Sequence, residues 1–558
     1  MSGPPDEALR RARVHLSDRG YLRPALPVAP RPAWRTVLRR LATAASIAAA
    51  CALTAVSAAG APLRLLAPLA LALFPACAVV ALLAAASGRA AARLGLRVGM
   101  APGHVATILA ALAGVALVGT IGAAAGQGAL GLAPALPGLL AGAALAVVVV
   151  RSARRALLAD LAYRTPVVVA RWWSELAVTA AVLAVGATLV LAQRQTDKAP
   201  LEVEGAVFPP AQGRIAVVAV DGLARADLEA APLLLPGIGL ERVALWGWAP
   251  LKAPRTELPA VFWTTVACGV PPATHGVVEI EDMRLFGCEE GVPLPAPLRL
   301  AVLPLWRPLG AARLLARPAL TRRSATFWEM ASRAGCPVTV GGWWGSWPVR
   351  QVLGEIASER AWLGGAVGAD AVTPGLVTVV REGWQRPDGA SVASGRLATA
   401  LVERAMAASA PHVLALALPG LDLERRGQPG APPIDAASRA LPHLRRLALL
   451  LDSLERAGYS VWLVAAPWGA GRAFVASSVA PSGVTPPVDV LALAGTWLDQ
   501  LGLPLPLGAP PPCRELSRAG SPSAPAATYG PPPPVVAAPA EPGQAVQREL
   551  LRNLGYLQ

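Results

Sequence analysis

The sequence has few of the residues that usually bind metals or carry charge. Of its 558 residues only five are His and six are Cys, and charged residues make up 15% of the chain. The cysteines show none of the paired spacings typical of zinc modules, so a zinc finger or ribbon is excluded. Apolar residues reach 54%. A chain this apolar and this poor in charge indicates a part that is embedded in a membrane.

The net charge of +15 could suggest a nucleic-acid partner, but its placement argues against one. Residues 1–40 hold nine Arg against three acidic residues, and further Arg residues lie between long apolar stretches. Basic residues that flank apolar segments are typical of membrane topology rather than of DNA or RNA binding. We therefore expect a cytoplasmic, Arg-rich N-terminal segment over 1–40 and no nucleic-acid partner.

Five apolar stretches follow, each close to the length of about 20 residues that spans a bilayer. They cover residues 41–59, 65–86, 105–125, 130–150 and 176–192. A buried helical bundle in a soluble protein is the alternative, but five such stretches in succession favour a membrane. We predict a transmembrane domain of five helices over 41–192, with the lipid bilayer as its partner.

The orientation follows from the distribution of Arg between the stretches. Segments 87–103 and 151–173 contain three and five Arg, whereas the alternate loops hold only Arg64. The positive-inside rule then places these segments and the N-terminus in the cytoplasm. Five crossings put residues 193–558 outside. The sequence thus predicts a multi-pass protein of the cell (inner or plasma) membrane with a large extracytoplasmic domain.

The extracytoplasmic part is organised around the run Ile215–Val220, which ends on Asp221 and Gly222. A short apolar run closed in this way is typical of a buried parallel strand. Further strands are predicted at 241–248, 336–341, 413–418, 460–466 and 473–478, with helices at 324–334, 394–410, 435–457 and 488–501. Pro259 can open another helix, which Gly269 would close. Such alternation predicts an α/β domain with a mostly parallel sheet.

The domain boundaries follow from composition. A polar connector covers 193–212, and the α/β domain covers 213–506. The Pro/Ala-rich composition of 507–543 predicts a disordered linker. Residues 544–558 are predicted to form a short C-terminal helix. Cys268, Cys288, Cys336 and Cys513 lie in the extracytoplasmic part, where disulfides are permitted, but their pairing stays open, and free thiols are the alternative.

Several motifs together resemble one known family. The blocks are Asp221-Gly222-Leu223, Pro259-Ala260-x-x-Trp263-Thr264-Thr265, Pro272-x-x-His275-Gly276-Val277, Gly341–Pro348, Leu418–Asp422 and the stretch 488–506. They are similar to the alkaline phosphatase superfamily, and within it to the type I phosphodiesterase and nucleotide pyrophosphatase group. The resemblance covers about residues 212–506. It implies a sulfatase-like α/β fold and the hydrolysis or transfer of phosphate, phosphonate or sulfate esters.

The resemblance also implies a site of two metal ions, often zinc, with a Ser or Thr nucleophile. Asp221 matches the first ligand, and Asp422 matches the Asp of an Asp-x-x-x-His pair. The remaining positions depart from the pattern: Arg426 replaces the His of that pair, and Pro467 and Trp468 stand where Asp and His belong. Pro259 occupies the nucleophile position, and Thr256 is the nearest hydroxyl that could serve if the loop is rearranged.

These departures favour a catalytically degenerate protein that binds or assembles components of the cell envelope. Its partners would be envelope proteins or a phosphate-containing ligand, and no cofactor is expected. The alternative is an active hydrolase or transferase that acts on envelope phosphoesters or nucleotides with zinc or manganese. In the degenerate case, the charge repulsion between Asp221 and Asp422 must be offset. We expect a shared proton, Arg425 or Arg426, or solvent exposure to do so.

Overall fold

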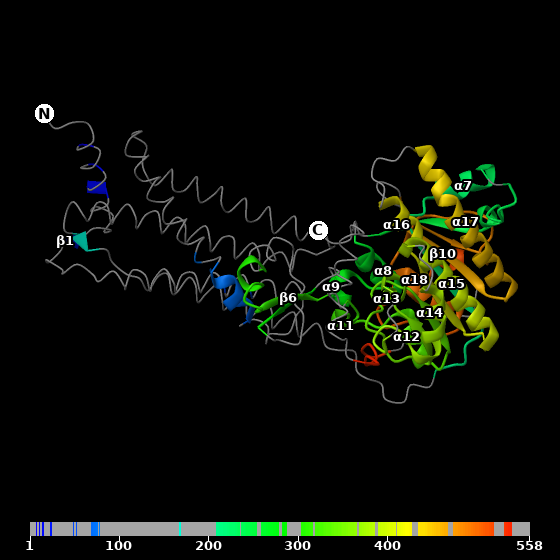
Figure 1. Ribbon diagram of the computed structural model, residues 1–558. Helices are drawn as coiled ribbons and strands as arrows, with labels where there is room; N and C mark the ends of the chain where they lie inside the picture. The colour runs from blue at the N-terminus through cyan, green and yellow to red at the C-terminus, as the bar shows by residue number, and fades with distance from the viewer. Residues whose placement is uncertain are drawn as a thin grey trace. The chain divides into compact units, whose positions relative to one another are not determined.

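The computed structural model describes most of the chain from residue 208 onward (Figure 1). The described residues are 208–234, 236–253, 258–277, 282–286, 303–315, 318–364, 368–384, 389–408, 410–426, 433–466, 472–517 and 529–537. Before residue 208 they are 7, 11, 14, 15, 23, 24, 48, 52, 68–75, 78, 167 and 168.

The chain divides into two compact units. The first contains residues 1–198 together with 283–314, and the second contains 199–282 with 315–558. The five predicted spans belong to the first unit and lie almost entirely outside the described residues. Within the part of the chain that the structure describes, no helix is both long and apolar enough to cross a bilayer. Strands β1 (Arg23–Pro24) and β2 (Val167–Val168) pair in this unit.

The second unit is an α/β domain around a mixed sheet of nine strands. Five central strands run parallel in the order β10-β3-β9-β7-β8. Beyond β10, β11 pairs antiparallel with both β10 and β4, and β12 and β13 pair parallel with β4. The strands are β3 (Ile215–Asp221), β4 (Gly247–Lys252), β7 (Val338–Gly341), β8 (Gly354–Ala357), β9 (Val413–Leu418), β10 (Ser460–Ala466), β11 (Phe474–Ser477), β12 (Gly483–Val484) and β13 (Val488–Asp489).

Helices cover both faces of this sheet, as expected for buried parallel strands. Helices α15, α16 and α17 contact β7, β9, β3 and β10, and α7 and α14 pack against them. Helices α8, α12 and α18 contact one another, and α12 also contacts β7 and β9. Their bounds are α7 (Arg225–Leu234), α8 (Pro259–Cys268), α12 (Phe327–Arg333), α14 (Val377–Trp384), α15 (Gly389–Ala408), α16 (Gly420–Arg426), α17 (Pro433–Arg456) and α18 (Ala492–Gln500).

Shorter elements complete the described part of the chain. They are α9 (Pro272–His275), α11 (Pro318–Thr321), α13 (Glu359–Gly364), the 3₁₀ turns η2 (Val243–Leu245), η3 (Pro374–Leu376) and η4 (Arg514–Leu516), and a two-stranded sheet of β5 (Asp282–Leu285) and β6 (Ala312–Leu315).

Most element boundaries follow the predictions, and four do not. The helix predicted at 394–410 begins earlier, at Gly389. The predicted strand at 241–248 begins only at Gly247, because the Glu241 carboxylate accepts the N–H groups of Gly237 and Gly239 and holds a turn before η2. The helix predicted from residue 324 begins at Phe327, where Thr326 and Glu329 form a capping box. The helix predicted from residue 488 begins at Ala492, because β13 takes residues 488–489 into the sheet.

The face of the sheet under α8, α12 and α18 is packed with aromatic rings. Trp343 lies edge-on to Trp263 and to Trp328, with ring centroids 5.7 and 5.3 Å apart. Phe327 and Trp497 continue the cluster at 4.6 Å. All five side chains are fully or almost fully buried. Edge-to-face packing of large rings leaves these side chains little freedom, so the groups they carry are held in place.

Part of the predicted linker belongs to the domain. The Tyr529 hydroxyl donates to the carbonyl of Pro504, and the Tyr529 ring stacks on Phe208 at 5.0 Å. Further along, the N–H of Val536 donates to the carbonyl of Val349, and Gln351 donates to Pro534. Residues 529–537 therefore form an ordered strip along the domain rather than a disordered linker.

The glycine after β3 allows two elements to approach closely. Gly222 has a φ of 79°, and a Cβ there would lie 2.7 Å from the backbone nitrogen of Asp422. Gly458 has the same φ, but a Cβ there would meet nothing within 4 Å. The left-handed backbone therefore strains both positions equally, and only Gly222 adds a collision between main chains.

We predict that Gly222→Ala lowers the free energy of unfolding more than Gly458→Ala does. Backbone strain should cost about 1 kcal/mol in each variant. The collision should add about 2 kcal/mol at Gly222. Urea unfolding followed by tryptophan fluorescence measures both. Equal losses would show that β3 and α16 do not approach as closely as described.

Candidate functional site

Two aspartates lie at the carboxyl end of the central strands. Asp221 is the last residue of β3, and Asp422 lies in the first turn of α16, which follows the neighbouring parallel strand β9. The next residue, Gly222, packs against the Asp422 main chain and donates its N–H to the carbonyl of Ala466 at the end of β10. Three adjacent strands thus bring Asp221, Asp422 and the end of β10 together, where α/β proteins ordinarily bind ligands.

Asp221 is buried and accepts two indole hydrogen bonds. The Trp263 Nε1–H donates to Oδ1 at 2.6 Å, and the Trp344 Nε1–H donates to Oδ2 at 2.9 Å. Asp221 is only 6% exposed. The carboxylate therefore has a donor on each oxygen in a place that water barely reaches. Solvent exposure, one of the expected means of offsetting its charge, is wrong for Asp221.

Both indoles are positioned by rigid surroundings. Trp263 lies in the middle of α8, and its ring packs edge-on against Phe262 and Trp343. Trp344 follows β7 and packs edge-on against Trp362, with centroids 5.2 Å apart. Because each ring is locked by neighbours, its N–H remains aimed at the carboxylate, which strengthens the interaction relative to a mobile donor.

A buried glutamate holds the loop that carries Trp344. Glu359 accepts the N–H groups of Ser346 and Trp347 and the hydroxyl of Ser346, at 2.9–3.1 Å. Burial raises the pKa of the Glu359 carboxyl, although these donors and Arg360 oppose the rise. The guanidinium of Arg360 lies 3.5 Å from the centroid of the Trp347 ring. The loop is therefore anchored by polar contacts as well as by aromatic packing.

The position that the family gives to the nucleophile has no reactive group. Pro259 is the first residue of α8 and carries neither a hydroxyl nor a backbone N–H. The nearby hydroxyls of Thr264 and Thr265 donate to the carbonyls of Ala260 and Val261, one turn earlier in the helix. Thr256, Pro467 and Trp468 lie outside the described residues, as do the side chains of Arg425 and Arg426.

His275 is a satisfied structural residue. Its Nδ1 accepts the N–H of Val277 at 3.1 Å, and its Nε2 lies 3.0 Å from the Thr265 hydroxyl oxygen. Because that hydroxyl donates to Val261, Nε2 carries the proton and donates to it. Burial lowers the pKa of His275 to about 3, and the charge of Arg322 lowers it further. The ring is thus neutral and occupied at both nitrogens.

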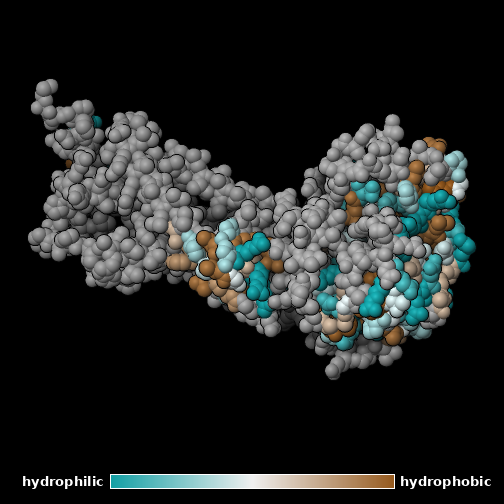
Figure 2. All heavy atoms as spheres, viewed as in Figure 1, coloured by the Kyte–Doolittle hydropathy of each residue, from teal (hydrophilic) through white to brown (hydrophobic). Residues whose placement is uncertain are grey.

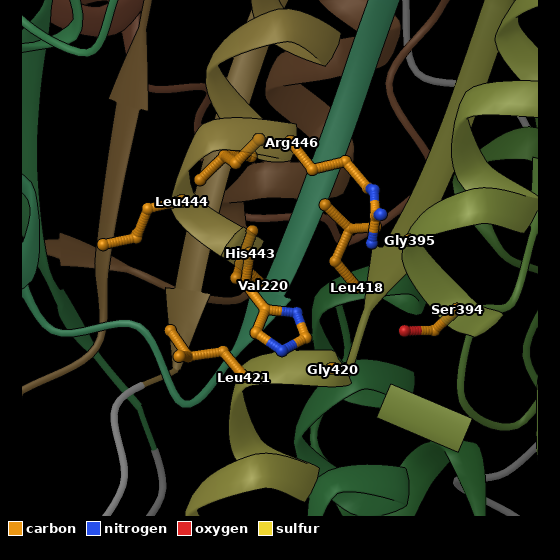
Figure 3. Close-up of a pocket in the computed structure, with 10 residues that line it drawn as sticks. Val220, Ser394, Gly395, Leu418, Gly420, Leu421, His443, Leu444 and Arg446 are labelled. Carbon is orange, nitrogen blue, oxygen red and sulfur yellow. The ribbon is translucent and has the colours of Figure 1, made fainter. Parts of the chain in front are cut away.

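A small crevice is lined by residues of α15, α16 and α17, together with Val220 of β3 and Leu418 of β9 (Figure 3). Ser394, His443 and Arg446 are its polar lining, and the Arg446 guanidinium extends toward Gly395. Burial lowers the pKa of His443; Glu424 opposes this and Arg446 adds to it. The cavity measures about 20 Å³. This volume holds about one water molecule, so the crevice is too small for an organic ligand.

Few metal-binding side chains come together in the described part of the chain. Among the residues that the structure describes, no group of three or more His, Cys, Asp or Glu is placed to hold a metal ion. The first-ligand position, Asp221, already accepts a hydrogen bond on each oxygen. Cys268, Cys336 and Cys513 are buried free thiols. Burial raises the pKa of Cys268 to about 12, so it is not a thiolate ligand.

The sequence did not reveal the indole partners of Asp221. Trp263 was read as part of a structural motif and Trp344 as core or pocket wall. A buried tryptophan needs a partner for its N–H, and this requirement is the signal that could have suggested a carboxylate acceptor.

Comparisons with known proteins found similar solved structures at low sequence identity. No family model matches it, and no curated protein does. Similar solved structures include phosphonoacetate hydrolase from Sinorhizobium meliloti 1021, with 18% identity and a TM-score of 0.32, covering 47% of this chain and 58% of that one. Murine ectonucleotide pyrophosphatase/phosphodiesterase 5 has 14% identity and a TM-score of 0.29, covering 45% and 56%.

Phosphonate monoester hydrolase from Silicibacter pomeroyi has 12% identity and a TM-score of 0.34, covering 56% of this chain and 78% of that one. The chain spans just under three fifths of the length of the phosphonoacetate hydrolase and of the murine protein.

We predict that the indole donors stabilise the fold through Asp221. Trp263→Phe and Trp344→Phe should each cost about 1.5–3 kcal/mol beyond the lost ring area, because each removes a hydrogen bond to a carboxylate. Trp497→Phe is the matched control: Trp497 is fully buried, and its Nε1 has no hydrogen-bond partner within the described residues. Urea unfolding of the three variants measures the difference. Losses no larger than that of the control would contradict the interaction.

A second prediction concerns pH. Below pH 6.5 the unfolded chain protonates His275, whereas the folded chain does not until about pH 3. The stability present above pH 6.5 is therefore lost as the pH falls, with a slope of about 1.4 kcal/mol per pH unit. His275→Gln keeps one acceptor and one donor but cannot titrate. Between pH 7 and pH 5, the free energy of unfolding should fall less for this variant than for the unsubstituted chain. Parallel pH profiles of the two proteins would contradict the lowered pKa of His275.

Proposed function

We propose that the chain is a membrane-anchored member of the alkaline phosphatase superfamily, of the type I phosphodiesterase and nucleotide pyrophosphatase kind, that has lost catalysis. In this proposal the extracytoplasmic domain binds or assembles components of the cell envelope. The motifs between Asp221 and the stretch ending at residue 506 support the family. The parallel core with Asp221 at the end of β3 agrees with the arrangement that those motifs imply.

The main observation in favour of lost catalysis is that the Asp221 carboxylate accepts hydrogen bonds from two indoles. Each oxygen of this carboxylate already accepts an N–H from a ring that is locked in place, which leaves only its remaining lone pairs for a cation. The first-ligand position is thus already bonded by two neutral donors. Pro259 supports the same conclusion, because it stands at the position expected for the nucleophile and has no hydroxyl.

The membrane anchor rests on sequence. Five apolar stretches and the asymmetric Arg distribution support a multi-pass protein of the inner or plasma membrane, with the α/β domain outside. A domain held there would meet envelope proteins and phosphate-containing polymers or lipids, which are therefore the partners that we propose.

One observation keeps an active enzyme as the second candidate. Asp221 and Asp422 still lie at adjacent strand ends, and the backbone of Gly222 touches that of Asp422. A carboxylate has lone pairs beyond those that accept the two indoles. A hydrolase or transferase with a reduced set of zinc or manganese ligands would use these two residues.

We predict that the purified full-length chain contains no stoichiometric metal. Zinc, manganese or a chelator should leave the melting temperature unchanged, because no metal is coupled to folding. A specific site filled at about 100 times its Kd would instead add about 2.7 kcal/mol. Elemental analysis and thermal unfolding in detergent test both points. Hydrolysis of an aryl phosphodiester should stay at background with and without added metal.

Asp221→Asn separates the two candidates. If the site is degenerate, this variant changes stability and leaves the background hydrolysis as it is. Stoichiometric zinc or manganese, together with turnover that Asp221→Asn abolishes, would replace the degenerate protein with the active enzyme.

A further inference from the structure

One segment of the chain leaves the α/β domain and joins the N-terminal unit. Residues 283–314 belong to the same compact unit as residues 1–198. The excursion contains Glu289 and Glu290, but its remainder, residues 291–314, is rich in Leu and Pro and holds three Arg and no Asp or Glu. An apolar stretch whose charges are all basic is typical of chains that contact anionic lipid surfaces.

The excursion makes a specific contact with the N-terminal unit. The Trp306 Nε1–H donates to the backbone carbonyl of Ala72 at 2.9 Å, and the ring packs edge-on against Phe286 at 5.0 Å. Ala72 lies in the helical stretch 68–75, within the predicted span 65–86, and is fully buried.

Around this contact, large apolar side chains are exposed. Leu71 is 54% exposed, Leu305 is 48% and Leu309 is 72%. Arg307 and Arg313 are exposed beside them, so apolar and basic groups alternate along the surface. In the space-filling view, hydrophobic and hydrophilic residues lie side by side on the described part of this unit (Figure 2). This combination matches the boundary between lipid headgroups and acyl chains.

The depth of the contact agrees with that boundary. In the predicted topology the span 65–86 begins at the outer face of the membrane. Ala72 is seven residues into the span, which corresponds to about 10 Å along a helix. Amphipathic segments bury their apolar face about 5–10 Å into the interface, and Trp residues concentrate there.

We propose that residues 303–314 contact the outer leaflet of the bilayer beside the span 65–86. Leu305 and Leu309 lie at the acyl boundary, Arg307 and Arg313 lie at anionic headgroups, and Trp306 joins the segment to the span. The inference rests on the membrane anchor in the proposed function. It goes beyond it by assigning a lipid-binding surface to a segment of the extracytoplasmic part of the chain.

The test places a fluorescent probe on Leu309 in the full-length chain. The variant Leu309→Cys is labelled with an environment-sensitive dye and reconstituted in nanodiscs that contain phosphatidylglycerol. Leu507→Cys is the matched control, because Leu507 is 69% exposed and lies in the α/β unit. Labelling of the unsubstituted chain gives the background from native cysteines. A nitroxide on the acyl chain, near the headgroup, should quench the Leu309 probe at least about twofold more than the control probe.

Iodide in the buffer should quench the control probe at position 507 more strongly than the Leu309 probe. Equal quenching of both probes by the nitroxide would overturn the inference, and so would a Leu309 probe shielded from both quenchers, since a protein partner would then cover it. Flotation with lipid vesicles tests the membrane anchor separately from the lipid contact of residues 303–314. If the chain does not float, the membrane anchor fails and this inference fails with it. If it floats while the Leu309 probe is in water, only this inference fails.

Discussion

The arrangement at the end of the central sheet depends on one buried carboxylate. Asp221 ends β3 and is almost inaccessible to water, yet both of its oxygens accept an indole N–H. An isolated charge in such a place would be very costly, and a carboxylate with one donor removed would lose much of its compensation. The two tryptophans must therefore stay where they are for this strand end to remain buried.

That requirement accounts for the aromatic character of the surrounding core. Trp263 is held by Phe262 and Trp343, and Trp344 by Trp362. Replacing any of these rings with a smaller residue would leave a cavity and free the donor to move. The packed indoles therefore help to organise this edge of the sheet.

Other buried charges in the domain are neutralised by different means. Arg322 and Glu329 form an ion pair with both side chains buried, in which the guanidinium outweighs the burial of Glu329 and lowers its pKa. Glu329 also closes the capping box of α12. Removing one partner of a buried ion pair lowers the free energy of unfolding by about 3–5 kcal/mol. The charged groups of this pair thus serve to position elements of the domain.

The local pattern of the sequence was sufficient for much of the fold. The apolar run Ile215–Val220 predicted the central strand, and Pro259 and Gly269 bounded α8, because burial, proline geometry and left-handed glycine act within a few residues. The motifs also drew attention to Asp221 and Asp422. Some features were predicted less well. The start of α12 at Phe327 is set by the capping box of Thr326 and Glu329, and residues 529–537 are ordered by contacts with the distant Phe208 and Val349.

Only the tertiary structure decided which indoles donate to Asp221. These donors lie 42 and 123 residues away in the sequence: Trp263 is on α8, and Trp344 follows β7 of the same sheet. A tryptophan in a sequence predicts a large apolar ring, but the local pattern does not indicate which acceptor its single N–H will bond. The sequence by itself determined that a carboxylate stands at this strand end; packing across the sheet determined that it faces two indoles.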